Sequence, residues 1–141
     1  ELGWRGFLLY QFRKMSFVKA TLLTGAIWGI WHAPLILMGH NYPQHPIIGV
    51  FMMVVLCILI SPIITYFTIK SKSVVAAAVL HGTMNATATI SIIPIMGGSD
   101  LMTGMPGLAG MLAFLITGLV LFIYDQYISK EKIMTGILRK E

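Results

Sequence analysis

Long apolar runs, separated by short polar segments, make up almost the whole chain. Four runs are about as long as a helix that crosses the apolar core of a bilayer, and a shorter apolar segment precedes them. Alternating β-barrel patterning is absent, and lipid does not tolerate unpaired backbone groups. The pattern therefore predicts an all-α, polytopic transmembrane helical bundle with four complete spans plus the C-terminal half of an earlier one. The segments are Glu1 to Phe12, then Ala20 to Met38, Ile47 to Ile69, Val74 to Pro94 and Gly107 to Tyr127.

Composition supports a membrane protein over a soluble one. Of the 141 residues, 57% are hydrophobic and only 11% are charged, far from the balance of a soluble domain. The net charge of +5 comes from short basic groups between apolar runs and not from one stripe, so the predicted partner is the lipid bilayer and no nucleic acid. Cys57 is the one cysteine, which excludes a disulfide framework and a thiolate metal cluster.

The positions of the basic residues predict an orientation. The loops Gly39 to Pro46 and Ile95 to Pro106 contain no Lys or Arg, whereas the other connections carry nearly all of them. By the positive-inside rule, the basic side is cytoplasmic. We predict a multi-pass protein of the cell membrane, with one domain over residues 1–127 and a basic cytoplasmic tail over residues 128–141. Because the chain starts at Glu1 without an initiator Met, further spans are expected before it.

Three of the apolar segments carry an ionisable residue at a similar predicted depth. At about 1.5 Å per helical residue, Glu1, His32 and His81 lie roughly 14 to 20 Å from the basic residues at the cytoplasmic end. Ionisable side chains at this depth are costly and usually functional. We therefore predict that these three side chains meet at one site inside the membrane.

Polar neighbours at helical spacing extend this set. Arg5 follows Glu1 by four residues and Asn85 follows His81 by four, so each pair shares a helix face. A carboxylate, two imidazoles and an amide can activate water and stabilise an oxyanion, with Glu1 and one histidine as base and the second histidine and Asn85 as donors. The sequence has no His-Glu-x-x-His and no Gly-x-Ser-Gly motif. Its aspartates lie too far apart along the chain for an aspartyl dyad.

Other residues in this region have structural interpretations. Pro34 predicts a kink close to His32. Gly25 and Gly29 have the spacing of close helix packing. His40 and His45 lie in a polar loop on the outer side and are interpreted as solvated, with a surface metal site as the alternative.

Three ordered segments resemble the motifs of one enzyme family. Glu1 to Gly6, Trp28 to Pro34 and His81 to Asn85 resemble, in order and spacing, the three motifs of the CPBP (Abi) family of intramembrane proteases. Those motifs read E-E-x-x-x-R, F-x-x-x-H and H-x-x-x-N or D, and Trp28 stands here in place of the Phe. The family includes CAAX prenyl-protein endopeptidases and bacteriocin-processing or immunity proteins, and the similarity covers Glu1 to about Asn85.

The resemblance implies an intramembrane hydrolase, a CAAX-protease-like endopeptidase that acts on a peptide or membrane-protein substrate with activated water. In the family, the first glutamate and the second-motif histidine are thought to activate the water, while the third-motif residues stabilise the oxyanion. Glu1 matches the second glutamate, so the first is expected just before it. The implied catalytic residues are Glu1, Arg5, His32, His81 and Asn85. The family's metalloprotease label implies zinc, with His32 and His81 as ligands.

Two other functions stay open from the sequence. A non-catalytic membrane protein of the same fold, such as an immunity or scaffold factor, would use the site to bind a peptide or a partner. A haem protein would use His32 and His81 as axial ligands. The sequence does not specify the natural substrate or the oligomeric state.

Overall fold

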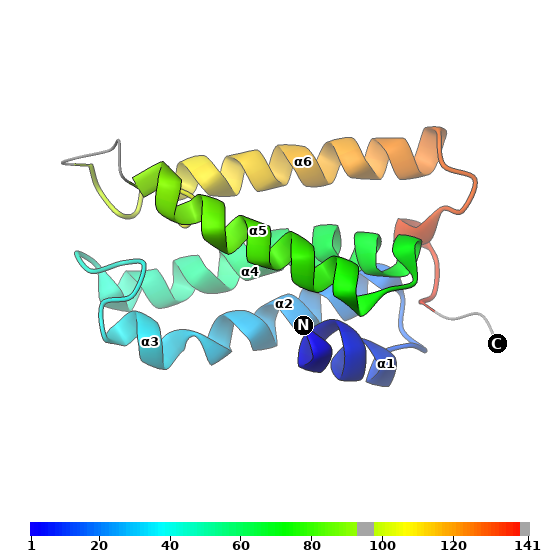
Figure 1. Cartoon of the computed structure of the whole chain (residues 1–141), viewed down its shortest axis with the longest axis horizontal. Helices are drawn as coiled ribbons and strands as arrows, with labels where there is room; N and C mark the ends of the chain where they lie inside the picture. The colour runs from blue at the N-terminus through cyan, green and yellow to red at the C-terminus, as the bar shows by residue number, and fades with distance from the viewer. Residues whose placement is uncertain (93–97, 139–141) are drawn as a thin grey trace.

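The computed structural model describes residues 1–92 and 98–138, with the backbone alone described over residues 89–92. Within these ranges every regular element is a helix, apart from one isolated β-bridge between Ser16 and Ile137. The predicted all-α class is therefore confirmed (Figure 1). The elements are η1 (Leu2–Leu8), α1 (Leu9–Gln11), α2 (Phe17–Trp31), α3 (Ala33–Leu37), α4 (Pro46–Ser71), α5 (Val74–Ile92), α6 (Leu108–Tyr127) and η2 (Ile133–Thr135).

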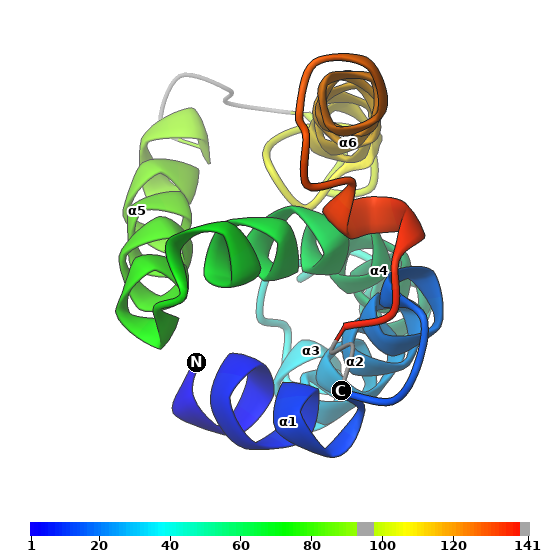
Figure 2. The same cartoon turned by 90° about the vertical axis from the view of Figure 1, so that its right-hand side faces the viewer.

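Helix α4 is the centre of the bundle and packs against α2, α3, α5 and α6. The end-on view in Figure 2 shows α5 on one side of α4, with α6 and α2 at other positions around it. The short N-terminal helices η1 and α1 lie beside α2, and η1 also contacts α5. This arrangement brings the beginning of the chain next to a helix that starts more than seventy residues later.

Glycines allow α2 to approach α4 closely. A Cβ atom on Gly25 would lie 2.7 Å from Ile58 Cα, and one on Gly29 would lie 2.5 Å from Val54 Cα. No side chain fits in that space, so backbone packs directly on backbone. The close packing predicted from the glycine spacing is confirmed.

The apolar run Ala20 to Met38 forms two helices and not one. Helix α2 ends at Trp31 and α3 begins at Ala33, with His32 between them. Pro34 causes the break, because it has no backbone N–H to donate and its ring would clash with the carbonyl one turn earlier. The break leaves His32 at a helix end, where its side chain can reach the last carbonyls of α2.

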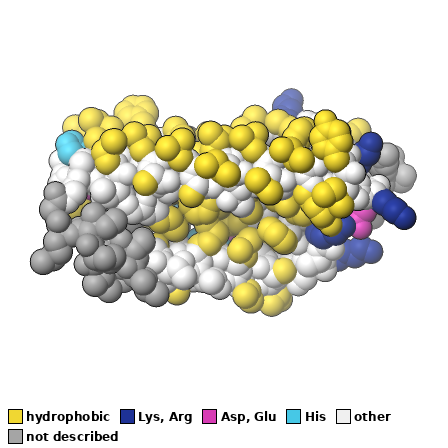
Figure 3. All heavy atoms as spheres, turned by 90° about the horizontal axis from the view of Figure 1, so that it is seen from above, with side chains coloured by type: hydrophobic (Ala, Val, Ile, Leu, Met, Phe, Trp, Pro, Cys, Tyr) yellow, Lys and Arg dark blue, Asp and Glu magenta, His cyan; other side chains and the backbone are white. Residues whose placement is uncertain are grey.

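Apolar surface covers the bundle along most of its length. Helices α4 and α6 are long and apolar enough to cross a bilayer, and α2 and α5 are shorter apolar helices in the described part of the chain. Figure 3 shows hydrophobic side chains spread along one face, with Lys and Arg gathered at one end. Side chains of α6 that would contact lipid include Leu112, Leu115, Ile116, Leu119, Val120 and Ile123.

The segment after α6 folds back on the basic end of the bundle. Asp125 is fully buried, and its carboxylate accepts hydrogen bonds from the backbone N–H groups of Ile133 (3.0 Å) and Met134 (2.8 Å). Met134 packs against Phe17 and Tyr66. The segment therefore links the end of α6 to the start of α2.

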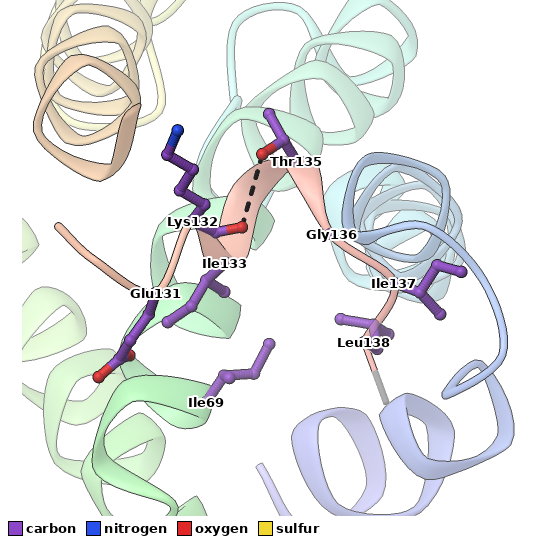
Figure 4. A pocket seen from close by; sticks show the side chains of 8 residues that line it. All are labelled: Ile69, Glu131, Lys132, Ile133, Thr135, Gly136, Ile137 and Leu138. Atoms are coloured by element: carbon purple, nitrogen blue, oxygen red, sulfur yellow. Dashed lines mark hydrogen bonds between the residues drawn. The ribbon is translucent and has the colours of Figure 1, made fainter. Parts of the chain in front are cut away.

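A shallow hollow lies between this returning segment and the end of α4 (Figure 4). Within it, the Thr135 hydroxyl donates to the Lys132 carbonyl at 3.5 Å. None of its lining residues belongs to the three sequence motifs, so it is separate from the predicted site. It is lined by Ile69, Glu131, Lys132, Ile133, Thr135, Gly136, Ile137 and Leu138.

Candidate functional site

The Glu1 carboxylate is held from two helices. Arg5 Nη1 donates to Glu1 Oε1 at 3.2 Å and to Oε2 at 3.1 Å, and His81 Nδ1 of α5 lies 2.7 Å from Oε1. The exposed fraction of the Glu1 side chain is only 2%, against 24% for His81. The carboxylate is thus removed from solvent and fixed between a cation and an imidazole.

Local winding of η1 places Arg5 beside Glu1. The Glu1 carbonyl accepts hydrogen bonds from the backbone N–H groups of both Arg5 (2.8 Å) and Gly6 (3.2 Å), as the first turn widens into a π-helix. The Arg5 guanidinium then lies over the Trp28 ring of α2, with Cζ 4.8 Å from the ring centroid. This cation–π contact helps to fix the guanidinium in the interior of the bundle, where Arg5 is buried.

His32 has a defined tautomer. Its Nδ1 lies 2.8 Å from the Trp28 carbonyl oxygen, one turn earlier in α2. Because a carbonyl oxygen only accepts hydrogen bonds, Nδ1 carries the proton. The Nε2 of the neutral ring then has a lone pair free to accept a proton, which is what a general base requires.

Trp28 is in contact with both histidines. Its ring meets His81 edge-on at a centroid distance of 5.0 Å and His32 at 5.7 Å. Since Arg5 lies on the same ring, one buried indole sets the spacing of three polar side chains. Spacing in the sequence linked Trp28 only to His32, because the contacts with Arg5 and His81 join residues far apart in the chain.

These side chains surround a cavity of about 520 Å³. Glu1, His32, His81 and Asn85 all line it, while Arg5 lies behind the wall, bound to Glu1. Four of the five residues predicted from the sequence thus face one space. The loop residues His40 and Asn41 also line the cavity, beside Trp4, Trp31, Met53 and Met105, although no sequence pattern placed them there.

A second hollow of about 510 Å³ lies between α5 and α6. Met84, Ala88 and Met105 line both this groove and the cavity, so the two spaces adjoin. The remaining walls of the groove are small or apolar, apart from Thr87. We call it the α5–α6 groove, and its α6 wall is made by Ala109, Gly110, Ala113 and Phe114.

The loop before α4 and the loop before α6 are joined by a polar cluster that we call the loop latch. His45 Nδ1 lies 2.7 Å from Asp100 Oδ1, and the Gln44 backbone N–H donates to Asp100 Oδ2 at 2.6 Å. The Tyr42 hydroxyl, fully buried, donates to the Pro106 carbonyl at 2.5 Å. The His45 side chain is 40% exposed, as expected for a solvated loop residue, and it has in addition a carboxylate partner that the sequence did not indicate.

The loop latch also lowers the pKa of Asp100. Removal from water acts to raise the pKa of Asp100, but the hydrogen bonds from His45 and from the Gln44 backbone outweigh it and hold the pKa below its ordinary value of 3.8. Asp100 therefore stays ionised at neutral pH, as the latch requires.

The metal-ligating side chains of the described residues are too few at any one place for a zinc site. Among residues 1–92 and 98–138, no three His, Cys, Asp or Glu side chains are grouped so that they could hold a metal ion. A zinc site in proteins ordinarily uses three or four protein ligands. His32 and His81 alone, with both Nδ1 atoms already engaged, do not make up such a shell.

Comparison with known proteins gives two matches. The family profile described as type II CAAX prenyl endopeptidase, Rce1-like, matches residues 1–87. A curated relative, CAAX prenyl protease 2 of Methanococcus maripaludis, is 34% identical over 92 residues, which are 60% of this chain and 34% of the relative. The chain thus spans about a third of that relative's length. No solved structure matches this chain.

Proposed function

The chain belongs to the Rce1-like family of type II CAAX prenyl endopeptidases, and we propose that it carries the catalytic site of an intramembrane endopeptidase. One observation supports this above the others. Glu1 at the start of η1, His32 between α2 and α3, and His81 on α5 converge on one cavity inside a largely apolar bundle. Ionisable side chains are costly to bury in a membrane, so those that are found there usually have a function.

We propose that the bundle is multi-pass, with α2–α3, α4, α5 and α6 as four complete spans and η1–α1 as the end of an earlier one. The gathering of Lys and Arg at one end in Figure 3 supports this topology. Under the positive-inside rule, that end and the tail over residues 128–141 are cytoplasmic. The proposed catalytic domain covers residues 1–127.

In the proposed mechanism, His32 is a general base. As the water oxygen attacks the peptide carbonyl, its proton moves to His32 Nε2, the nitrogen left free by the bond from Nδ1 to the Trp28 carbonyl. The glutamate that the family motif puts before Glu1 would share this role. When the tetrahedral intermediate collapses, the same proton passes to the leaving amine nitrogen.

His81 and Asn85 are proposed to stabilise the oxyanion. The Glu1 carboxylate accepts from His81 Nδ1, which orients the ring. A protonated His81 presents an Nε2–H donor, and Asn85 adds an amide donor one turn later on α5. Arg5 acts through Glu1, whose orientation it fixes.

The proposed substrate is a peptide or membrane protein with an apolar part. The relative's name specifies a prenyl protease, and a hydrocarbon chain would suit the α5–α6 groove that adjoins the cavity. A bulky side chain in the groove, as in Ala113→Phe, should then raise KM for substrates with a long apolar part and leave short water-soluble peptides unaffected.

Zinc remains a separate proposal, tested by metal analysis of the purified full-length protein. His32 and His81 would supply two ligands through Nε2. The other ligands would have to come from outside the described residues.

Peptide cleavage by the full-length protein in detergent or liposomes tests the proposed function. We expect His32→Ala and His81→Ala each to lower kcat about 100-fold or more, because each removes a proton-transfer or oxyanion group. His45→Ala is the matched control, since it removes the same side chain from the loop latch, outside the cavity.

Cleavage that survives both cavity variants in folded protein would contradict an enzymatic role for the site. The site would then bind a peptide or partner without chemistry, as in an immunity or scaffold protein.

A further inference from the structure

Several polar atoms behind the Glu1–Arg5 pair are buried without a partner. Arg5 uses Nη1 to bind Glu1, but within the described part of the chain its Nε and Nη2 have no hydrogen-bond partner, and neither do Thr24 Oγ1 and Ser61 Oγ. The exposed fractions of the whole residues are 2% for Arg5, 1% for Thr24 and 0% for Ser61. Buried polar groups are rarely left unpaired, because each loses its hydrogen bonds to water without replacement.

The packing of α2 on α4 brings the residues that carry these atoms to the same part of the bundle. Thr24 lies one turn before Trp28 on α2, and the Arg5 guanidinium lies 4.8 Å from the centre of the Trp28 ring. Ser61 lies one turn after Cys57 on α4, and Cys57 packs in the same buried cluster as Trp28. Cys57 also lies against the residue that follows Thr24, since a Cβ on Gly25 would be 2.8 Å from the Cys57 carbonyl oxygen. Thr24 and Ser61 thus each lie one helical turn along their own helix from a residue of this region, Trp28 on α2 and Cys57 on α4.

The chemistry of these atoms specifies what would bridge them. Guanidinium nitrogens only donate hydrogen bonds, whereas the two hydroxyls both donate and accept. The positive charge of Arg5 is already balanced by Glu1, so an anion would leave a second, uncompensated charge in the bundle. The bridging molecule is therefore small, neutral and able to donate and accept. Water has these properties and requires two to four polar partners, which these atoms provide.

We propose that ordered water lies between α2 and α4 behind Arg5, hydrogen-bonded to Arg5, Thr24 and Ser61. The water fixes the plane of the guanidinium, so that Nη1 faces the Glu1 carboxylate and Glu1 in turn holds His81. Thr24 and Ser61 are accordingly positioning residues, which act on the site through Arg5. The activity readout of this proposal rests on the proposed peptidase function, while its stability readout does not.

Thr65 extends the same line of hydroxyls. It lies one turn after Ser61 on α4, is fully buried, and its Oγ1 also lacks a partner among the described residues. Because α4 runs toward the basic end, the hydroxyls lead from that end to Arg5.

Isosteric removal of the hydroxyls in the full-length protein tests the proposal. Thr24→Val and Ser61→Ala should each lower the thermal midpoint, and should lower kcat about tenfold with KM unchanged, because each removes one hydrogen bond in a network that holds a charged group. The double variant should lower the thermal midpoint by less than the sum of the two single variants, since both hydroxyls hold the same water. Thr24→Ser keeps the hydroxyl and should retain wild-type behaviour.

Thr21→Val is the matched control. Thr21 is equally buried on α2, but its hydroxyl already donates to the Val18 carbonyl at 3.1 Å. We expect little change in its thermal midpoint and none in kcat. A high-resolution structure provides the direct readout, as density for water between Arg5 and the two hydroxyls.

Three results would overturn the proposal. First, Thr24→Val could leave the thermal midpoint unchanged or raise it, which would mean that the hydroxyl has no partner. Second, the midpoint could fall with kcat unchanged, which would mean that the hydroxyl does not position the site. Third, the density between Arg5 and the two hydroxyls could belong to a carboxylate and not to water. If the protein cleaves no peptide while Thr24→Val and Thr21→Val still differ in midpoint, the peptidase function fails and the water site stands. If the wild-type protein cleaves peptides while Thr24→Val and Thr21→Val have the same midpoint as wild type, the peptidase function stands and the water site fails.

Discussion

Arg5 and Glu1 form an ion pair whose side chains are 0% and 2% exposed. Removing one partner of a buried pair is costly, because the other charge is left uncompensated. We predict that Glu1→Gln lowers the free energy of unfolding by about 3 kcal/mol or more. Adding Arg5→Met to that variant should restore a large part of the loss, because the unpaired cation is then removed as well.

Reversible unfolding of the full-length protein in mixed micelles measures both variants. Lys72→Met serves as the control, since it removes an exposed cation at the basic end. A double variant as unstable as Glu1→Gln alone would mean that the loss does not come from the uncompensated guanidinium.

At the scale of single residues, the sequence predicts contacts between residues close in the chain better than contacts between distant residues. The spacing of Glu1 and Arg5 predicted their contact, because residues four apart share a helix face. The approach of His81 to Glu1 was predicted only from their similar predicted depth in the membrane. Similar depth is a weaker constraint, because it does not specify which atoms come into contact. The contacts of Trp28 with Arg5 and His81 had no sequence signal, since they depend on how η1 and α5 pack beside α2.

At the scale of the elements, apolar run length predicted helix bounds to within a few residues. The run Ile47 to Ile69 became α4 (Pro46–Ser71), and Gly107 to Tyr127 became α6 (Leu108–Tyr127). The widened winding of η1 was not predictable, because apolar patterning carries no information about which carbonyl each N–H selects. The break at His32 was predicted only as a kink at Pro34.

The packing of α2 on α4 leads to a prediction about glycine. Gly25→Ala puts a Cβ within 2.7 Å of the Ile58 backbone, so the two helices must separate. We expect a loss of about 1 to 3 kcal/mol in the free energy of unfolding, the usual cost of overpacking.

Gly118→Ala on α6 is its control, because a Cβ there has no neighbour within 4 Å. That variant should be neutral or slightly stabilising, since alanine favours a helix over glycine. Equal effects of the two substitutions on the thermal midpoint would contradict close contact between α2 and α4.

At the scale of the whole molecule, the loop latch joins connections more than fifty residues apart in the chain. Since the pKa of Asp100 is lower in the folded protein than its ordinary 3.8, the latch stabilises the fold above that pH. The contribution is lost as the pH falls through the folded-state pKa. We expect Asp100→Asn to lower the thermal midpoint at neutral pH, and the difference from wild type to shrink in acid.

Thermal unfolding from about pH 6 to about pH 3 measures this difference. Thr117→Val, in the apolar middle of α6, is the control and should differ from wild type by the same amount throughout. A difference between Asp100→Asn and wild type that grows in acid would contradict the sign of the pKa shift.

The returning segment after α6 has a consequence for biosynthesis. The isolated bridge between Ser16 and Ile137 and the bond from the Leu138 N–H to the Met15 carbonyl (3.1 Å) join the start of α2 to residues made much later. While the ribosome is still adding α6, the Phe17 side chain has no Met134 to cover it. The basic end of the bundle therefore closes only after residue 138 has left the ribosome, when all the helices that it joins have already been synthesised.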